Sequence, residues 1–148
     1  MRNVTSHQAI LVRRARGCDV QEIETLLSTE DLDRSAFILE DFLVAEALAG
    51  GFAGCARLKS YSDCVELSSV AVHPMYRGQG IGSAIVAALL EHAAVPAIYL
   101  VCEPKETAFF ARFGFQVLCR AHVPPMLLPK LFAYESKVGT MVAMKREA

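Results

Sequence analysis

The sequence lacks the features that are typical of proteins that bind nucleic acids or cross membranes. Its largest basic cluster is the short run Arg13-Arg14-Ala15-Arg16, and the formal net charge of the 148 residues is -1. Because a nucleic-acid binder needs a basic surface, we expect no nucleic-acid partner. The longest uncharged apolar stretch, residues 81–90, is shorter than the roughly 20 residues that span a bilayer, so we expect no membrane partner.

Disulfide and metal-binding patterns are also missing. The five cysteines are odd in number and include no C-x-x-C pair, and the four histidines are scattered. Residues 1–8 contain no apolar segment, so we expect no signal peptide. Together these features indicate reduced thiols and a cytoplasmic protein. Since zinc sites need clustered ligands, we expect no metal.

The sequence does contain enough hydrophobic residues to form a core. Hydrophobic residues make up 53% of the chain and charged residues 21%, and no repeat, low-complexity segment or linker interrupts it. This composition is typical of a globular protein rather than a disordered one. We therefore expect a single domain over residues 1–148.

Apolar periodicity and turn residues predict alternating strands and helices. We expect strands over residues 9–15, 42–48, 52–58, 64–72, 97–102, 115–120 and 140–145. We expect helices over residues 19–28, 35–40, 81–93 and 105–113. Asp19 is the predicted N-cap of the first helix, with Glu22 at the capping-box position. The apolar run 97–102 is typical of a strand buried on both faces, and the proline-containing segment 122–130 is predicted to be irregular.

The stretch from Val65 to Gly82 carries the clearest chemical signal, V-E-L-S-S-V-A-V-H-P-M-Y-R-G-Q-G-I-G. A strand runs into a glycine-rich turn, and an Ala/Leu-rich helix follows at once. Free backbone N–H groups at the positive end of that helix favour a phosphate or pyrophosphate. Gly78 and Gly80 can adopt left-handed backbone angles and place no Cβ in the way of phosphate oxygens.

Two other nucleotide motifs fit this turn less well. A P-loop ends in G-K-[ST], whereas the chain reads Gly82-Ser83-Ala84. A dinucleotide fingerprint needs a third glycine, where the chain has Ser83, and an acidic residue about twenty positions later. Glu103 lies near that spacing, so a nicotinamide-binding oxidoreductase stays open as an alternative.

The order of elements resembles the GCN5-related N-acetyltransferases, the GNAT family. The resemblance covers most of the chain, from Ile10 to Lys145. Its sharpest parts are Leu67 to Ser83, which contains Arg77-x-x-Gly80-x-Gly82, and the run F-F-A-R-F-G-F from Phe109 to Phe115. It implies an α/β fold with a mixed, largely antiparallel sheet of six to seven strands, splayed at a bulge in the fourth strand, and about four helices on its faces. It also implies transfer of an acetyl group from acetyl-coenzyme A (acetyl-CoA) to an amine.

The resemblance also implies the contacts with coenzyme A (CoA). The amides from Arg77 to Ser83 hold the pyrophosphate, and the strand before them offers backbone groups to pantetheine. The implied CoA-binding residues are Val70, Ala71, Val72, Arg77, Gly78, Gln79, Gly80, Ile81, Gly82, Ser83, Phe109 and Phe110.

The reaction requires a proton acceptor and a donor to the oxyanion. An amine attacks a thioester only when it is neutral, so a group must take its proton. Glu66 and Val70 lie four residues apart on a predicted strand, and a period of two places them on one face. Glu66 is therefore the candidate general base. A solvated carboxylate is the alternative reading of Glu66, and His73 is a weaker candidate base. The resemblance gives the oxyanion to the backbone N–H of Val70.

The chain departs from the family where a tyrosine often protonates the leaving thiolate. The matching residue is Phe110, which excludes that acid, and Glu103 stands where an Asn is common. A thiol with a pKa of about 8.5 can leave as thiolate or take a proton from water. Tyr61, Tyr134 and Cys102 are the alternative candidates for this chemistry.

Two finer resemblances concern the acceptor amine. The F-F-A-R-F-G-F run without the tyrosine, and the pattern Leu128-Pro129-Lys130 … Ser136-Lys137-Val138, are similar to acetyltransferases of the N-acetylglutamate-synthase type, which modify free amino acids. The Val123-Pro124-Pro125 segment is instead similar to small acetyltransferases associated with arsenic resistance. An amino-acid carboxylate needs a cation, with Lys137 as first choice. The full set of candidate cations is Arg57, Lys59, Arg112 and Lys137.

Three alternatives stay open at this point. The acceptor can be another small amine or a protein N-terminus, and the chain can be a CoA-binding module without turnover. The assembly, monomer or homodimer, is open too.

Overall fold

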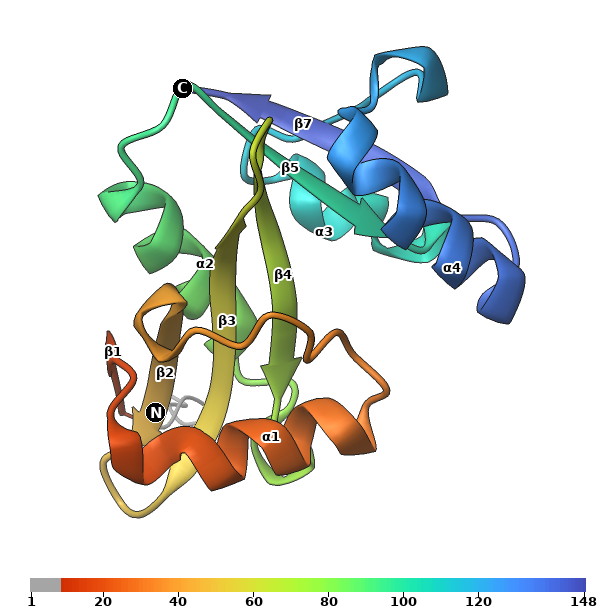
Figure 1. Cartoon of the computed structure of the whole chain (residues 1–148). Coiled ribbons are helices and arrows are strands. Elements are labelled where there is room, and N and C mark those ends of the chain that lie inside the picture. The colour runs from red at the N-terminus through yellow and green to blue at the C-terminus, as the bar shows by residue number, and fades with distance from the viewer. Residues whose placement is uncertain (1–8) are drawn as a thin grey trace. The chain divides into compact units, whose positions relative to one another are not determined.

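The computed structural model describes residues 9–148, so the expectation about a signal peptide in residues 1–8 lies outside the described residues. The chain divides into two compact units, whose elements are labelled in Figure 1. The first unit comprises Met1–Leu58 and Ser69–Ala93, and the second comprises Lys59–Ser68 and Ala94–Ala148. Each unit is therefore built from two segments of chain. Of the three boundaries, 58/59 and 68/69 fall inside strands, and 93/94 follows a helix.

The described residues contain a seven-stranded sheet with the order β1-β2-β3-β4-β5-β7-β6. The strands are β1 (Ile10–Arg14), β2 (Phe42–Ala47), β3 (Phe52–Ser60), β4 (Val65–Val72), β5 (Ala97–Cys102), β6 (Gln116–Val117) and β7 (Val142–Glu147). β4 and β5 pair in parallel at Glu66 and Tyr99. The pairs β1/β2, β2/β3, β5/β7 and β6/β7 are antiparallel. This mixed, largely antiparallel sheet confirms the expected fold class.

The helices of residues 9–148 are α1 (Val20–Thr29), α2 (Ile81–His92), α3 (Thr107–Ala111) and α4 (Leu128–Val138). None of them combines the length and the apolar character that crossing a membrane requires.

The first unit packs α1 against a core of strand residues. Ile23, Leu26 and Leu27 are buried, and their spacing of three and four places them on one face of α1. They share a cluster with Phe42 of β2 and with other buried residues of β2, β3 and β4. The sequence predicted this helix from its start at Asp19, and the structure adds the face that it buries.

Asp19 is the N-cap of α1, as the sequence predicted, but its carboxylate makes no capping bond to that helix. It accepts instead from Arg16 N and from the Arg13 guanidinium. The helix expected over residues 35–40 is wrong, because only a 3₁₀ turn occurs, at Leu39–Asp41. Ala36 has φ +47, which a right-handed helix does not allow.

The second unit packs α4 against a smaller core. Leu127 and Leu131 are buried beside Val123 and Ala143, and half-buried residues of β5 complete the cluster. The expectation that residues 122–130 are irregular is wrong at its end, because a 3₁₀ turn at Pro125–Leu127 leads into α4. Pro129 lies in the first turn of α4, where no helical partner for its nitrogen is needed.

Two predicted strands of the second unit also differ. β5 has one buried face and one half-buried face, so it is not buried on both; the half-buried Tyr99 and Val101 pack on the α4 cluster. The strand expected over 115–120 shrinks to the two residues of β6, because the chain turns into a 3₁₀ helix at Arg120–His122.

Candidate functional site

The predicted pyrophosphate loop, residues 77–83, lies in the first unit between β4 and α2. Gly78 and Gly80 both adopt left-handed backbone angles, with φ +77 and +79. A Cβ at either position would meet no protein atom within 4 Å, so the surface there is open. Gly80 is the N-cap of the twelve-residue α2, and the first turn of α2 contains no acidic residue. The loop therefore fits a bulky anion such as a pyrophosphate.

The side chains next to this loop are mostly structural. Arg77 Nε donates to Val72 O (3.1 Å), and its guanidinium pairs with Glu30 at 2.7 Å. The Arg77 amide donates to Pro74 O (3.4 Å), so the first amide of the predicted row is already engaged. His73 Nδ1 accepts from Met75 N (3.1 Å), which uses one ring nitrogen to hold the turn. This geometry gives no support to His73 as a base.

Strand β4 is interrupted at Ser69, which has φ +59. A left-handed residue with a Cβ breaks the regular pleat, so the period-two rule does not carry from Glu66 to Val70. The distortion lies in the fourth strand, where the resemblance implies a bulge. Glu66 and Ser68 precede it and do share one face.

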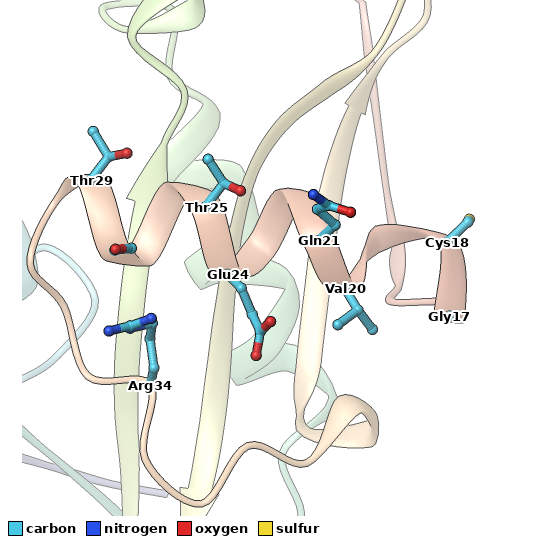
Figure 2. A pocket seen from close by; sticks show the side chains of 9 residues that line it. Gly17, Cys18, Val20, Gln21, Glu24, Thr25, Thr29 and Arg34 are labelled. Atoms are coloured by element: carbon cyan, nitrogen blue, oxygen red, sulfur yellow. The ribbon is translucent and has the colours of Figure 1, made fainter.

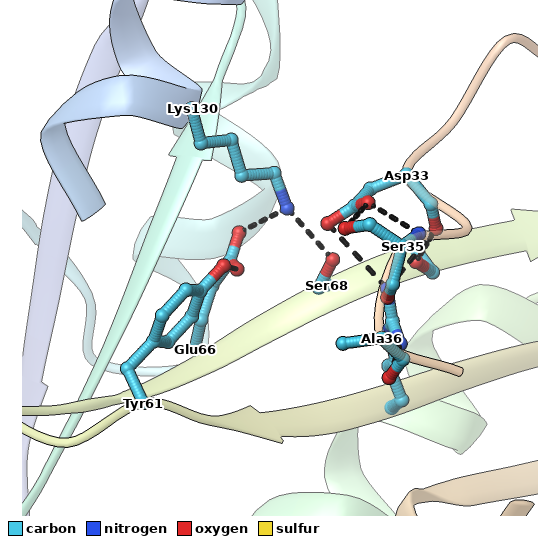
Figure 3. Close-up of polar contacts among 9 residues, drawn as sticks. Asp33, Ser35, Ala36, Tyr61, Glu66, Ser68 and Lys130 are labelled. Atoms are coloured by element: carbon cyan, nitrogen blue, oxygen red, sulfur yellow. Dashed lines mark hydrogen bonds and ion pairs between the residues drawn. The ribbon is translucent and has the colours of Figure 1, made fainter. Parts of the chain in front are cut away.

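Glu66 is the centre of a buried polar network in the second unit (Figure 3). The residue is 1% exposed. Its Oε1 accepts from the Tyr61 hydroxyl at 2.8 Å, and its Oε2 pairs with Lys130 Nζ. Lys130 Nζ also donates to Ser68 Oγ at 2.9 Å. We call Tyr61, Glu66, Ser68 and Lys130 the Glu66 network. The alternative of a solvated carboxylate is wrong.

Lys130 is the residue that sequence reasoning missed. It lies on α4, in the segment expected to be irregular, so no element was predicted to carry it toward β4. The one available signal was its place in the Leu128-Pro129-Lys130 run of the amino-acid acetyltransferase pattern. Lys130 Nζ also lies 5.9 Å from the centre of the Tyr134 ring.

A second ammonium group lies close to the Glu66 network. Lys59 is 7% exposed, and its Nζ lies 5.3 Å from the centre of the Tyr61 ring. One ammonium group thus pairs with the carboxylate, and a second lies over the ring of the tyrosine that donates to it. Such a cluster can attract an anionic group as well as accept a proton.

The other three candidate cations have different surroundings. Arg57 is fully buried and donates to backbone carbonyls, so it is not a carboxylate receptor. Arg112 lies over the rings of Phe109 and Phe113, at 5.0 and 5.8 Å. Lys137, the first choice, lines a hollow of about 380 Å³ on α4 together with Tyr134.

Cys102 and the α3 phenylalanines serve packing. Burial raises the pKa of Cys102 to about 12, so a reactive thiolate is disfavoured. Its thiol contacts Met144 Sδ at 3.9 Å. Phe110 is 9% exposed and meets Phe109 and Phe115 edge to face. Cys102 is therefore a poor proton donor in place of the missing tyrosine, and the CoA contacts of Phe109 and Phe110 stay predictions.

A larger hollow of about 740 Å³ runs along the outer side of α1 and contains none of the predicted site residues (Figure 2). Its lining is mostly polar and includes Gln21, Glu24, Thr25 and Arg34. Within residues 9–148, no group of three His, Cys, Asp or Glu side chains is arranged to hold a metal ion.

Known proteins similar to this chain are acetyltransferases. A family model described as "Acetyltransferase (GNAT) domain" matches residues 39–117. A curated "Amino-acid acetyltransferase" of Mycobacterium tuberculosis is 40% identical over 117 residues, which cover 71% of this chain and 67% of that protein.

Two solved structures are also similar to this chain. Rv2747 of Mycobacterium tuberculosis, crystallised with CoA and a second ligand, matches 93% of this chain and 99% of its own, with a TM-score of 0.74 and 28% identity. N-acetylglutamate synthase of Neisseria gonorrhoeae, crystallised with CoA and N-acetyl-glutamate, has a TM-score of 0.75 over 96% of this chain. At 22% identity that second likeness shows the fold alone, and this chain spans only 36% of the synthase.

Proposed function

The chain belongs to the GNAT family of acetyltransferases, and we propose that it acetylates the α-amino group of a free amino acid. Its acyl donor is acetyl-CoA. The observation that carries the acceptor proposal is the buried carboxylate of Glu66, which pairs with Lys130, together with the ammonium group of Lys59 over the Tyr61 ring. A free amino acid presents the complementary pair, an amine and a carboxylate. The relative of 40% identity, named as an amino-acid acetyltransferase, supports the same acceptor class.

The 77–83 loop is the proposed binding site of the acyl donor. Gly78, Gly80 and the start of α2 form a cradle that fits the pyrophosphate of CoA. When bound, acetyl-CoA supplies a thioester carbonyl that an amine can attack. The family membership sets aside the nicotinamide-binding alternative that Glu103 had left open.

On the acceptor side, Glu66 takes the proton of the amine. Tyr61 and Lys130 each hold one oxygen of its carboxylate, so its direction is fixed before the acceptor arrives. General-base catalysis of this kind contributes about a hundredfold to ten-thousandfold to rate. Since Phe110 replaces the family tyrosine, the thiolate leaves without that acid.

We place the acceptor's carboxylate at Lys59 and Lys130, in preference to Lys137. An ammonium group away from water attracts an anion more strongly than one at the surface. Lys59 is 7% exposed and the Lys130 side chain 14%, whereas Lys137 is exposed. The carboxylate also replaces the negative charge that Lys130 loses when Glu66 is protonated.

The test is the release of free thiol from acetyl-CoA with a panel of amines. We expect turnover with one or more free amino acids and at least tenfold lower kcat/KM for the matching amino-acid amides. An amide that is accepted as well as the acid contradicts carboxylate recognition. Turnover with only polyamines, peptides or an arsenic-resistance-type substrate moves the acceptor to that class and leaves the donor site untouched.

We further propose that residues 1–148 act as one N-acetyltransferase domain in the cytoplasm, without nucleic-acid or membrane partners. The cytoplasmic location is supported by the five cysteines, none of which forms a disulfide. The assembly is open between monomer and homodimer, and sedimentation of the purified chain decides it.

A further inference from the structure

Arg57 is a buried charge that the proposed reaction does not use. It lies on β3 with no exposed side-chain surface. Its Nη1 donates to Ala36 O (3.2 Å), and its Nη2 donates to Asp33 O (3.2 Å) and Ser35 O (3.0 Å). The guanidinium also pairs with the Asp33 carboxylate at 3.4 Å and lies over the Phe42 ring. Burying a cation costs free energy unless it is paired and hydrogen-bonded, so removal of these partners would leave a buried charge uncompensated.

The segment that Arg57 holds is strained. Asp31 and Ala36 have φ +56 and +47, and the remaining non-glycine residue with a left-handed backbone among residues 9–148 is Ser69, in β4. Side chains with a Cβ rarely adopt these angles, and such residues persist only where their surroundings hold them. The Asp33 carboxylate adds to this restraint, since it accepts from the Ser35 amide at 2.8 Å (Figure 3).

One carbonyl joins the strained segment to the strained strand. Asp33 O accepts from Arg57 Nη2 and also from Ser69 Oγ, the latter at 2.8 Å. The thiol of Cys55 donates to Ser69 O at 3.8 Å. All of these contacts lie within the first unit. We call Arg57, residues 33–36 and Ser69 the Arg57 clasp.

The clasp ends one residue before the implied oxyanion donor. Ser69 C=O and Val70 N–H belong to the same planar peptide group, so whatever fixes one fixes the direction of the other. Asp33 O holds the Ser69 hydroxyl and the Cys55 thiol donates to the Ser69 carbonyl, so both the side chain of Ser69 and its peptide plane are restrained. With Ser69 at φ +59, the Val70 N–H is thereby kept from the direction it would take in a regular strand. An oxyanion donor is effective only when its direction is set before the reaction.

We propose that Arg57 and Ser69 are positioning residues that aim the Val70 N–H at the developing oxyanion. The inference rests on the proposed function, since Val70 matters only if acetyl transfer takes place at β4. Arg57 acts through residues 33–36 and Ser69 and touches no substrate. The clasp also explains why a buried arginine occupies a position that packing alone would give to an apolar side chain.

The decisive variant is Ser69→Ala, which removes the bond to Asp33 O and keeps a Cβ. We expect kcat to fall about tenfold, because a donor that is misdirected rather than removed loses part of its usual effect. We expect the KM for acetyl-CoA and the rise in Tm caused by CoA to stay unchanged. The amide resonance of Val70 should shift, whereas that of Gly80 should not. Ser60→Ala, on the exposed end of β3, is the matched control and should change none of these quantities.

Arg57→Lys tests the other end of the clasp. One ammonium group cannot reach three carbonyls in the fork geometry of a guanidinium, so we expect the same fall in kcat and the same Val70 shift. If this variant does not fold, Ser69→Ala decides alone. An unshifted Val70 resonance or a wild-type kcat in Ser69→Ala overturns the proposal. Loss of the CoA-induced rise in Tm together with kcat also overturns it, because the clasp would then support the cofactor site.

The failure of the acceptor proposal is a separate outcome. If no free amino acid is acetylated, the acceptor class is wrong, but the Val70 resonance in the free protein and the kcat with any accepted amine still report on the clasp.

Discussion

The two compact units contain two kinds of site. In the first unit the 77–83 loop is made of consecutive residues, and its chemistry comes from the backbone and from a helix start. In the second unit the Glu66 network joins Tyr61, Glu66 and Ser68 to Lys130, which lies far away in the sequence on α4. The first site is encoded locally, and the second exists only when α4 packs near β4.

This difference predicts how each site responds to substitution. A backbone site tolerates many side chains but not a change that alters its φ angles. A side-chain network depends on every member, because the loss of one partner leaves the others buried and unsatisfied. Four experiments test or sharpen this contrast.

The largest effect is expected for Gly80→Val. Valine is strained at φ +79, and its side chain would enter the open surface where we place the pyrophosphate. We expect the rise in Tm caused by acetyl-CoA to vanish. Gly51→Val is the matched control, because Gly51 has φ +86 and equally open surroundings, in the turn between β2 and β3. It should lose a similar amount of intrinsic stability and keep the acetyl-CoA response. Equal responses in both variants would contradict the pyrophosphate assignment.

Glu66→Gln is expected to lower kcat about tenfold to a thousandfold, within the reach of general-base catalysis. The rise in Tm caused by CoA should be retained, because the loop that holds CoA contains no part of the network. Glu91→Gln, an exposed change on α2, is the control and should keep full activity. Unchanged activity of Glu66→Gln across the pH range would assign the proton to another group.

Lys130→Met removes the ammonium partner of a carboxylate that is 1% exposed. We expect the free energy of unfolding to fall by about 3 kcal/mol, at the lower end for a broken buried pair since Lys130 keeps some exposure. Denaturant unfolding measures this loss. The double variant with Glu66→Gln should recover part of this lost stability, because it no longer contains a buried carboxylate without its ammonium partner. Additive losses in the double variant would show that the two residues do not act as a pair.

The smallest effect is expected for Asp19→Asn in the first unit. Hydrogen bonds from the Arg13 guanidinium hold the pKa of Asp19 below its usual range. The stabilisation is therefore present above the unfolded pKa, about 3.9, and is lost as the pH falls through the lower folded value. We expect a loss of about 2 kcal/mol at neutral pH, typical of hydrogen bonds to a charged group. The gap between wild type and variant should close toward low pH; a gap that stays constant would contradict the ion pair.

Much of the fold could be read from the sequence where the signal was local. The helix α1, the neighbouring strands β2 and β3, and the turn into α2 were all predicted from short patterns. The failures have two causes. Residues 35–40 have helix-forming residues, but the carbonyls of Ser35 and Ala36 accept from Arg57, a residue of β3. The prolines before α4 were interpreted as breakers, although Pro129 lies in its first turn.

The sequence by itself determined the glycine-rich loop, the order of elements and the choice of Glu66 as a candidate base. These depend on backbone preferences and on apolar spacing within a few residues, which any short segment already contains. Only the tertiary structure decided that Glu66 is paired with Lys130, that Arg57 faces carbonyls rather than a substrate, and that Ser69 departs from the strand. Each of those facts is a contact between residues distant in sequence, and its free energy arises only when both partners are buried together.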